Sequence, residues 1–197
     1  MAKSRSAPLS KANLPRPRTD GDGNELANLI LLRIARTECP SIFPSLEFVR
    51  LKLHQVLHES GEVIRSVYFG NTGLASVLAV QPDGKSIEVG LIGNEGFVGI
   101  PIVFGFKTSA TRVVAQSDGT AYRIDADTLR KLLPKCPKLA LTLQRFGMIL
   151  GSQTTQLAAC NGQHDAHERL ARWLLMSQDR IGGKILPLTQ EFLSQML

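Results

Sequence analysis

The residue types best suited to chemistry in this 197-residue sequence are Cys160, His164 and His167, spaced at i, i+4 and i+7. On a helix this spacing places all three on one face, and thiolate and imidazole are ligands that zinc prefers. Asn161-Gly162 interrupts the stretch and no fourth ligand is evident nearby. We therefore interpret the trio as the polar end of a helical seam and predict no metal site and no cofactor. Asn161 and Gly162 are instead a predicted hinge, because glycine lowers helix stability by ~1 kcal/mol relative to alanine.

Other chemical motifs are sparse. The sequence has no Ser/His/Asp, HExxH or P-loop pattern, so we predict that the protein is not an enzyme. Its cysteines, Cys39, Cys136 and Cys160, are odd in number and scattered, with no CxxC pair. We therefore expect neither a disulfide framework nor an iron–sulfur cluster.

A glycine-rich loop is the second candidate site. Gly93, Gly96 and Gly99 recur at every third position, and backbone N–H groups in such a loop can bind an anion. Glycine also serves tight turns that need a positive φ. Because the loop holds no basic residue, we favour turns over an anion site.

The net charge of +6 suggests a nucleic-acid partner until its distribution is considered. Residues 1–18 hold five basic residues and no acid, so subtracting 5 from +6 leaves +1 for residues 19–197. We expect residues 1–23 to be a disordered basic tail rather than a specific binding arm. No apolar segment follows its charges and no apolar run is long enough for a membrane span. We therefore expect a cytoplasmic protein that does not contact membranes.

After the N-terminal tail, the spacing of apolar residues divides the sequence into helical and β segments. A helical pattern covers residues 24–36, and a shorter helical piece is expected over 44–50. From 49 to 124 short β runs alternate with glycine turns, which is typical of an antiparallel sandwich or barrel. The expected strands are 51–57, 66–69, 74–80, 86–92, 111–115 and 120–124.

After a short helix over 125–133, apolar residues recur at alternating spacings of four and three. This heptad pattern predicts a long helix that pairs with a second copy in a parallel homodimer. The alternative, a helix packed on its own β-domain, explains the first two turns. The seam begins with Leu139 and continues with Leu143, Phe146, Leu150, Gln153, Leu157, Cys160 and His164. A further amphipathic helix carries Leu170, Trp173, Leu174 and Met176, and another begins near Leu188-Thr189.

Five stretches, taken in order, resemble bacterial Crp/Fnr-type transcription regulators over residues 24–197. They are Val67–Leu74, Gly93–Gly99, Gln156–Asn161, Glu168–Met176 and Leu188–Leu197, the last resembling the first helix of a helix-turn-helix. The resemblance implies an α+β fold: an antiparallel β-roll (double-stranded jelly roll) with flanking helices, a long dimerisation helix and an incomplete winged helix-turn-helix. The implied division is a sensor at 24–137, a dimerisation helix with hinge at 138–163, and a partial DNA-binding domain at 164–197.

The resemblance also implies DNA as a partner. Thr189, Gln190 and Gln195 would belong to the partial DNA-binding domain. A helix-turn-helix reads bases with its second helix, and the chain ends before that helix. We therefore expect the chain as given to bind DNA weakly or not at all. The alternative is a stand-alone sensor and dimerisation module.

Cyclic-nucleotide-binding members of the family hold their ligand with a Gly-Glu-Leu turn and a downstream Arg-Ser/Thr-Ala triplet. Here Gly99 is followed by Ile100-Pro101, no arginine precedes Ser109-Ala110, and Arg112 lies one to three positions away. An arginine fork to phosphate is not replaced by a nearby serine. We therefore expect either a degenerate pocket or a pocket for a small-molecule effector other than cyclic AMP or cyclic GMP. The candidate pocket residues are Gly96, Gly99, Ser109, Ala110 and Arg112.

Overall fold

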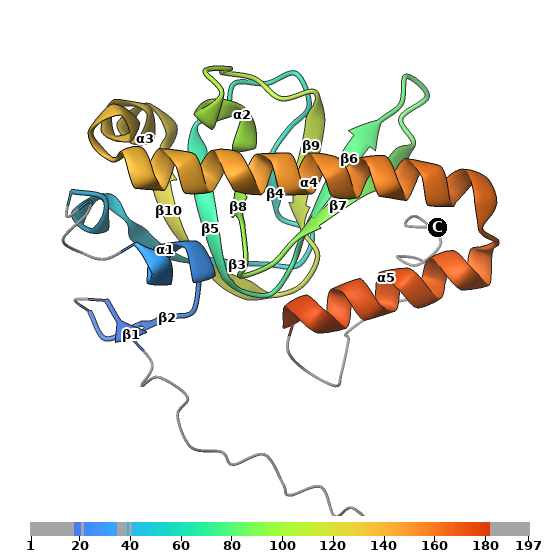
Figure 1. Ribbon diagram of the computed structural model, residues 1–197, viewed down its shortest axis with the longest axis horizontal. Coiled ribbons are helices and arrows are strands. Elements are labelled where there is room, and N and C mark those ends of the chain that lie inside the picture. The colour runs from blue at the N-terminus through green and yellow to red at the C-terminus, as the bar shows by residue number, and fades with distance from the viewer. Residues whose placement is uncertain (1–17, 21, 35–38, 40, 182–197) are drawn as a thin grey trace, which may run out of the picture.

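The computed structural model describes residues 18–20, 22–34, 39 and 41–181. It is an α+β fold in which two four-stranded antiparallel sheets form a β-roll and a long helix, α4, lies across it (Figure 1). Within the described part of the chain, no helix is both long and apolar enough to cross a membrane. The predicted fold class is confirmed by this architecture, apart from the helix-turn-helix, whose expected first helix at 188–197 lies outside the described residues.

The first sheet has the strand order β3-β10-β5-β8. Its strands are β3 (Glu47–Leu51), β5 (Ser66–Thr72), β8 (Phe97–Val98) and β10 (Gly119–Asp125). The second sheet has the order β4-β9-β6-β7. Its strands are β4 (Val56–His58), β6 (Ala75–Val80), β7 (Ser86–Ile92) and β9 (Thr111–Ala115). Side chains of both sheets pack into one hydrophobic core, with Phe69 and Phe97 fully buried.

The strand predictions hold best where glycine turns bound a run. The predicted 86–92 and 111–115 match β7 and β9. The predicted strand 51–57 is wrong, because β3 ends at Leu51 and β4 begins at Val56, with His54 at a positive φ of 64° between them. The helix predicted over 44–50 is also wrong. Only a 3-10 turn, η1 (Phe43–Ser45), forms there, and β3 then pairs with β10.

The N-terminal segment contains less helix than the sequence predicts. The expected helix 24–36 is reduced to α1 (Leu29–Arg33), because β2 (Glu25–Leu26) pairs with β1 (Arg18–Thr19). Asn28 caps α1, because its side-chain oxygen accepts hydrogen bonds from the backbone N–H groups of Ile30 and Leu31. Its side-chain amide also donates to the carbonyl of Gly96. Residues 18–19 therefore belong to a strand rather than to a disordered tail; residues 1–17 lie outside the described part.

Cys39 and Cys136, which are 97 positions apart in the sequence, form a disulfide with their Cα atoms 5.5 Å apart. The expectation of no disulfide is therefore wrong. Both residues are buried in the core, where the segment after α1 meets the start of α4. The sequence did not predict this disulfide, because two cysteines so far apart are brought together only by the folded chain and their pairing has no local signature in the sequence.

Three helical pieces follow the β-roll: α3 (Ala126–Leu132), the 3-10 turn η2 (Leu133–Lys135) and α4 (Pro137–Gln163). At the far end of α4 the chain reverses, and α5 (Ala166–Ile181) returns beneath it (Figure 1). The break falls at His164, whose backbone is extended. The predicted hinge is thus displaced, since Asn161 and Gly162 lie in the last turn of α4.

The heptad seam faces the protein's own β-roll. Leu139, Leu143, Phe146 and Leu150 are buried in the core, and Cys160 is buried where α4 ends. The interpretation of Leu143, Phe146 and Leu150 as dimer-seam residues is therefore wrong, and the alternative extends further along α4 than its first two turns. The pairing of Gln153, Leu157 and Cys160 with a second copy stays a prediction. Gln153 and Leu157 are half-buried on the same side. The opposite side of α4 exposes apolar groups instead: Leu141, Met148 and Ile149 are 47%, 67% and 66% exposed.

Candidate effector cavity

A cavity of about 230 Å³ lies between the inner face of the second sheet and α4. Alternation along the strands directs every second side chain inward, which places Val77, Ile92 and Val113 in its wall. The helix contributes Gly147, Leu150, Gly151 and Thr154, and the short helix α2 (Ile100–Val103) contributes its first residues. Three structural parts that are distant in sequence thus share one apolar enclosure.

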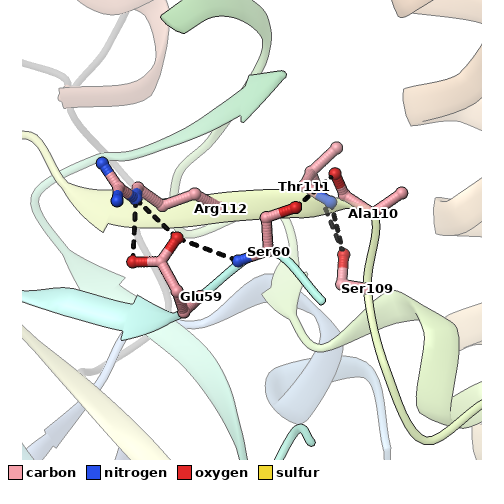
Figure 2. A network of polar contacts seen from close by, with 6 residues as sticks. All are labelled: Glu59, Ser60, Ser109, Ala110, Thr111 and Arg112. Atoms are coloured by element: carbon pink, nitrogen blue, oxygen red, sulfur yellow. Dashed lines mark hydrogen bonds and ion pairs between the residues drawn. The ribbon is translucent and has the colours of Figure 1, made fainter. Parts of the chain in front are cut away.

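Only a few polar groups reach this cavity. Ser109 and Thr111 line it, and their hydroxyl groups lie 2.9 Å apart (Figure 2). Thr154 lines the α4 side, where its hydroxyl donates to the carbonyls of Val89 and Leu150. None of the described residues that line the cavity is a lysine or an arginine.

Among the described residues that line the cavity, His58 is the one that can titrate. Its side chain is buried, and neither ring nitrogen has a hydrogen-bond partner within the described structure. Burial lowers the pKa of His58 to about 4, although the nearby Glu59 carboxylate opposes this change. The imidazole is therefore neutral at neutral pH, and the cavity carries no positive charge there.

Arg112 points away from the cavity. Thr111 and Val113 on either side of it face inward, so strand alternation turns Arg112 outward. Its Nε donates to both carboxylate oxygens of Glu59, at 2.7 and 2.9 Å (Figure 2). This hydrogen-bonded pair raises the pKa of Arg112 and lowers that of Glu59, so both groups are charged and paired. The prediction of Arg112 as a pocket residue is wrong because its strand register directs it to the other face.

The other predicted pocket residues divide. Gly99 and Ser109 line the cavity. Ala110 is exposed, and its carbonyl accepts a hydrogen bond from the Ser60 hydroxyl at 2.9 Å (Figure 2). Gly96 lies beneath α4 and outside the cavity wall, where a Cβ atom would overlap the ring of Phe146.

The glycine loop has a mixed role. Gly99 has a positive φ of 108° and precedes α2, in agreement with the turn interpretation. Gly93 and Gly96 bound a turn in which the Gly96 N–H donates to the Gly93 carbonyl at 3.3 Å, but neither glycine has the positive φ that was expected. They are small because helices approach closely: Gly96 contacts Phe146 of α4, and a Cβ atom on Gly93 would lie 2.9 Å from Cβ of Arg180 on α5.

The Cys/His trio is not assembled into a cluster. Cys160 is buried and its sulfur accepts a hydrogen bond from Gln156 at 3.3 Å, whereas His164 and His167 are exposed. The described residues hold no group of three or more histidine, cysteine or acidic side chains placed to bind a metal ion. Thr189, Gln190 and Gln195, which were predicted to belong to a DNA-binding domain, lie outside the described residues.

Comparison with known proteins identifies the β-roll. Residues 48–136 match the cyclic nucleotide-binding domain family. The matched region is a little less than half of the chain, and it includes every strand of both sheets except the first residue of β3. No curated protein sequence matches the chain.

Several solved structures resemble this chain over a longer stretch than the family match does. CLP, the c-di-GMP-responsive global regulator of Xanthomonas campestris, is 16% identical with a TM-score of 0.67, covering 82% of this chain and 84% of CLP. FixK2 from Bradyrhizobium japonicum is 15% identical with a TM-score of 0.61, covering 76% of each chain. A Eubacterium rectale structure described as a transcriptional regulator of the Crp/Fnr family is 13% identical with a TM-score of 0.67, covering 85% and 79%. At such low identity these likenesses establish the fold alone.

Sequence reasoning missed two features of the site. His58 closes a short apolar strand and has no partner residue in sequence that would mark it as a cavity residue. Thr154 was not predicted, because the heptad pattern identifies only the seam positions of α4 and Thr154 is not one of them. A strand-by-strand inward alternation would have found Thr111 and Val113 and would have excluded Arg112.

Proposed function

We propose that this chain contains the sensor and dimerisation regions of a Crp/Fnr-type transcription regulator, whose β-roll binds a small uncharged effector in the cavity under α4. The fold supports this proposal, because the solved structures it resembles include regulators described as global or Crp/Fnr-type. The observation that carries the effector class is the cavity wall, which offers apolar groups, hydroxyls and a neutral imidazole but no cation.

An anionic ligand would be poorly held in this cavity. Burying an unpaired charge costs several kcal/mol, and Arg112, the arginine that was predicted to line the pocket, is already bound to Glu59. Ligand pockets commonly have volumes of ~300–1,000 Å³, so a cavity of about 230 Å³ suits a small molecule. An uncharged compound with one or two polar atoms could use the hydroxyls of Ser109 and Thr111.

The regulator proposal also needs a dimer and DNA. The apolar strip formed by Leu141, Met148 and Ile149 on the exposed side of α4 is the proposed homodimer surface. Leu141 and Met148, two turns apart on α4, lie opposite the stripe that the helix buries in its own core, and Ile149 lies at the flank between these two faces. In the parallel arrangement proposed here, the two cavities would lie on either side of the paired helices.

A gel-shift experiment tests the DNA-binding part of the proposal. The protein expressed from its complete gene should retard DNA from its own upstream region, with affinity that falls steeply as salt rises. A version ending at residue 163, which lacks α5 and everything after it, is the matched control and should not retard the DNA. If neither version binds, the alternative of a stand-alone sensor and dimerisation module is favoured; if both bind equally, the assignment of DNA binding to the C-terminal region is wrong.

A further inference from the structure

The outer face of the second sheet carries a buried acidic residue, and α5 covers it. Glu88 on β7 is only 8% exposed. One carboxylate oxygen accepts hydrogen bonds from Ser76 and Gln116 on the same sheet, at 2.7 and 3.2 Å. The other accepts from the indole N–H of Trp173 on α5, at 2.8 Å. Glu88 thus joins the sensor sheet to the helix that leads towards the C-terminus.

A second contact holds the far end of α5. Arg180 donates to Glu95 at 2.8 Å, and its guanidinium also lies 3.5 Å from the side-chain oxygen of Gln153 on α4. Apolar burial between these two points is modest: Trp173 packs on Leu91, with Leu174 and Met176 partly buried beside them. The attachment of α5 therefore depends on a few polar contacts more than on a large hydrophobic core.

The same strand borders the effector cavity. Leu91 packs against Trp173 on the outer side of β7, whereas the next residue, Ile92, lines the cavity on the inner side. Val89, in the same strand, accepts a hydrogen bond from Thr154 of α4 at 2.7 Å. One strand thus separates the cavity from the docking surface of α5.

From these contacts we propose that α5 is a reversible latch, docked on the outer face of the second sheet through Trp173, and that the charge of Glu88 sets how firmly it is held. In the closed state the indole is buried against Leu91. In the open state Trp173 and Glu88 are both exposed to water, and α5 is free to take another position relative to the β-roll.

The surroundings of Glu88 give the latch its pH dependence. Burial raises the pKa of Glu88 to about 7, although hydrogen bonds from Ser76 and Trp173 and the charge of Arg180 oppose the rise. The charged groups near it are Arg180 from α5 and that residue's own partner, Glu95; the facing groups of the sheet, Ser76 and Gln116, are neutral.

The direction of the effect follows from proton linkage. When α5 leaves, Glu88 is exposed and its pKa returns towards the ordinary value of 4.5. Closing the latch therefore takes up a proton between about pH 4.5 and about pH 7. The closed state weakens as pH rises through this range and then changes little above it.

Tryptophan fluorescence can measure the latch directly, because Trp173 is the only tryptophan in the sequence. Acrylamide quenching of the whole chain should be weak at about pH 5.5 and should increase towards about pH 8, with a red shift of the emission. The Glu88→Ala variant should be open at every pH, because loss of the hydrogen bond to a buried carboxylate shifts the docking equilibrium roughly tenfold or more.

Glu88→Gln provides the decisive comparison. An amide can still accept from the indole, so this variant should remain closed while losing the pH dependence. Glu62→Ala, a change at an exposed acid in the turn before β5, is the matched control and should behave as the unaltered protein does. The proposal is overturned if Glu88→Gln keeps the same pH dependence as the unaltered chain, or if folded Glu88→Ala shields Trp173 as well as the unaltered chain does. Circular dichroism establishes which variants are folded.

Discussion

The ring of Phe146 on α4 lies over the backbone of Gly96, in the space that any side chain at Gly96 would occupy. The same ring packs against Phe97, with the ring centroids 5.6 Å apart. This contact sets how closely the long helix approaches the β-roll beside the cavity.

Replacing Gly96 with alanine should separate α4 from the β-roll. Overpacking of a core typically costs ~1–3 kcal/mol, and here the clashing atoms belong to a buried aromatic ring. We expect the free energy of unfolding, measured by urea titration, to fall by about that amount. Gly162→Ala is the control: it lies in α4 with open space around it, so the better helix propensity of alanine should raise stability by up to ~1 kcal/mol. Equal effects of the two changes would contradict this role of Gly96.

The proposed homodimer makes a prediction about the exposed side of α4. Placing glutamate at both Met148 and Ile149 should convert a dimer to a monomer, because two like charges would face each other across an apolar surface. Analytical ultracentrifugation measures the result. Val63→Glu, at an exposed apolar residue outside α4, is the control and should leave the dimer intact. A dimer that persists after the double change, or a chain that is monomeric from the start, would contradict the proposed surface.

His58 should contribute to acid lability. Its pKa is about 4 in the folded protein against an ordinary histidine value of 6.5, so between these values the unfolded chain binds a proton that the folded chain does not. Stability therefore falls as pH drops from about 6.5 to about 4, by on the order of 3 kcal/mol, since each tenfold change in an ionisation constant corresponds to ~1.4 kcal/mol.

Denaturant titrations across this pH range measure the contribution. The His58→Gln variant should lose much less stability on acidification than the unaltered protein. The matched control is His164→Gln, at an exposed histidine after α4. This variant should lose as much stability on acidification as the unaltered protein does. If His58→Gln and His164→Gln behave alike, the imidazole of His58 is not buried in neutral form.

The disulfide gives a further prediction. Linking Cys39 to Cys136 closes a long loop in the unfolded chain, and closure of a loop of ~100 residues contributes up to ~5 kcal/mol in the chain-entropy description. Reduction should therefore lower the free energy of unfolding substantially. A thiol assay on the denatured, unreduced protein should find one free thiol, that of Cys160. Three free thiols, with no effect of reductant on stability, would contradict the bridge.

Local patterns in the sequence predicted elements but not the faces that those elements present. Glycine turns and alternation located β7 and β9 correctly, and the alternating spacing of apolar residues after residue 133 located α4. The heptad spacing also marked one stripe of α4 correctly, but periodicity reports that a face is buried and does not say what covers it. The β-roll covers Leu143 and Leu150, so the exposed apolar strip on the other side was overlooked.

The site was predicted less well, for a related reason. Gly99 was found because it belongs to a glycine-rich loop, and Ser109 because it falls at the position of the family's Arg-Ser/Thr-Ala triplet. Arg112 was misplaced because one position along a strand reverses the face of a side chain. The partnership of Glu88 with Trp173 joins residues 85 positions apart, and long-range pairs of this kind are formed by the tertiary fold.

Calorimetric titration of the chain with cyclic AMP and cyclic GMP tests the account most directly, because it asks whether the cavity accepts a phosphate. The absence of any cationic side chain from the cavity wall predicts no measurable binding of either nucleotide at concentrations up to ~1 mM, which corresponds to a binding free energy weaker than about −4 kcal/mol. Binding of either nucleotide with a dissociation constant on the order of 1 µM, abolished by filling the cavity with Gly151→Leu, would contradict the proposal of an uncharged effector.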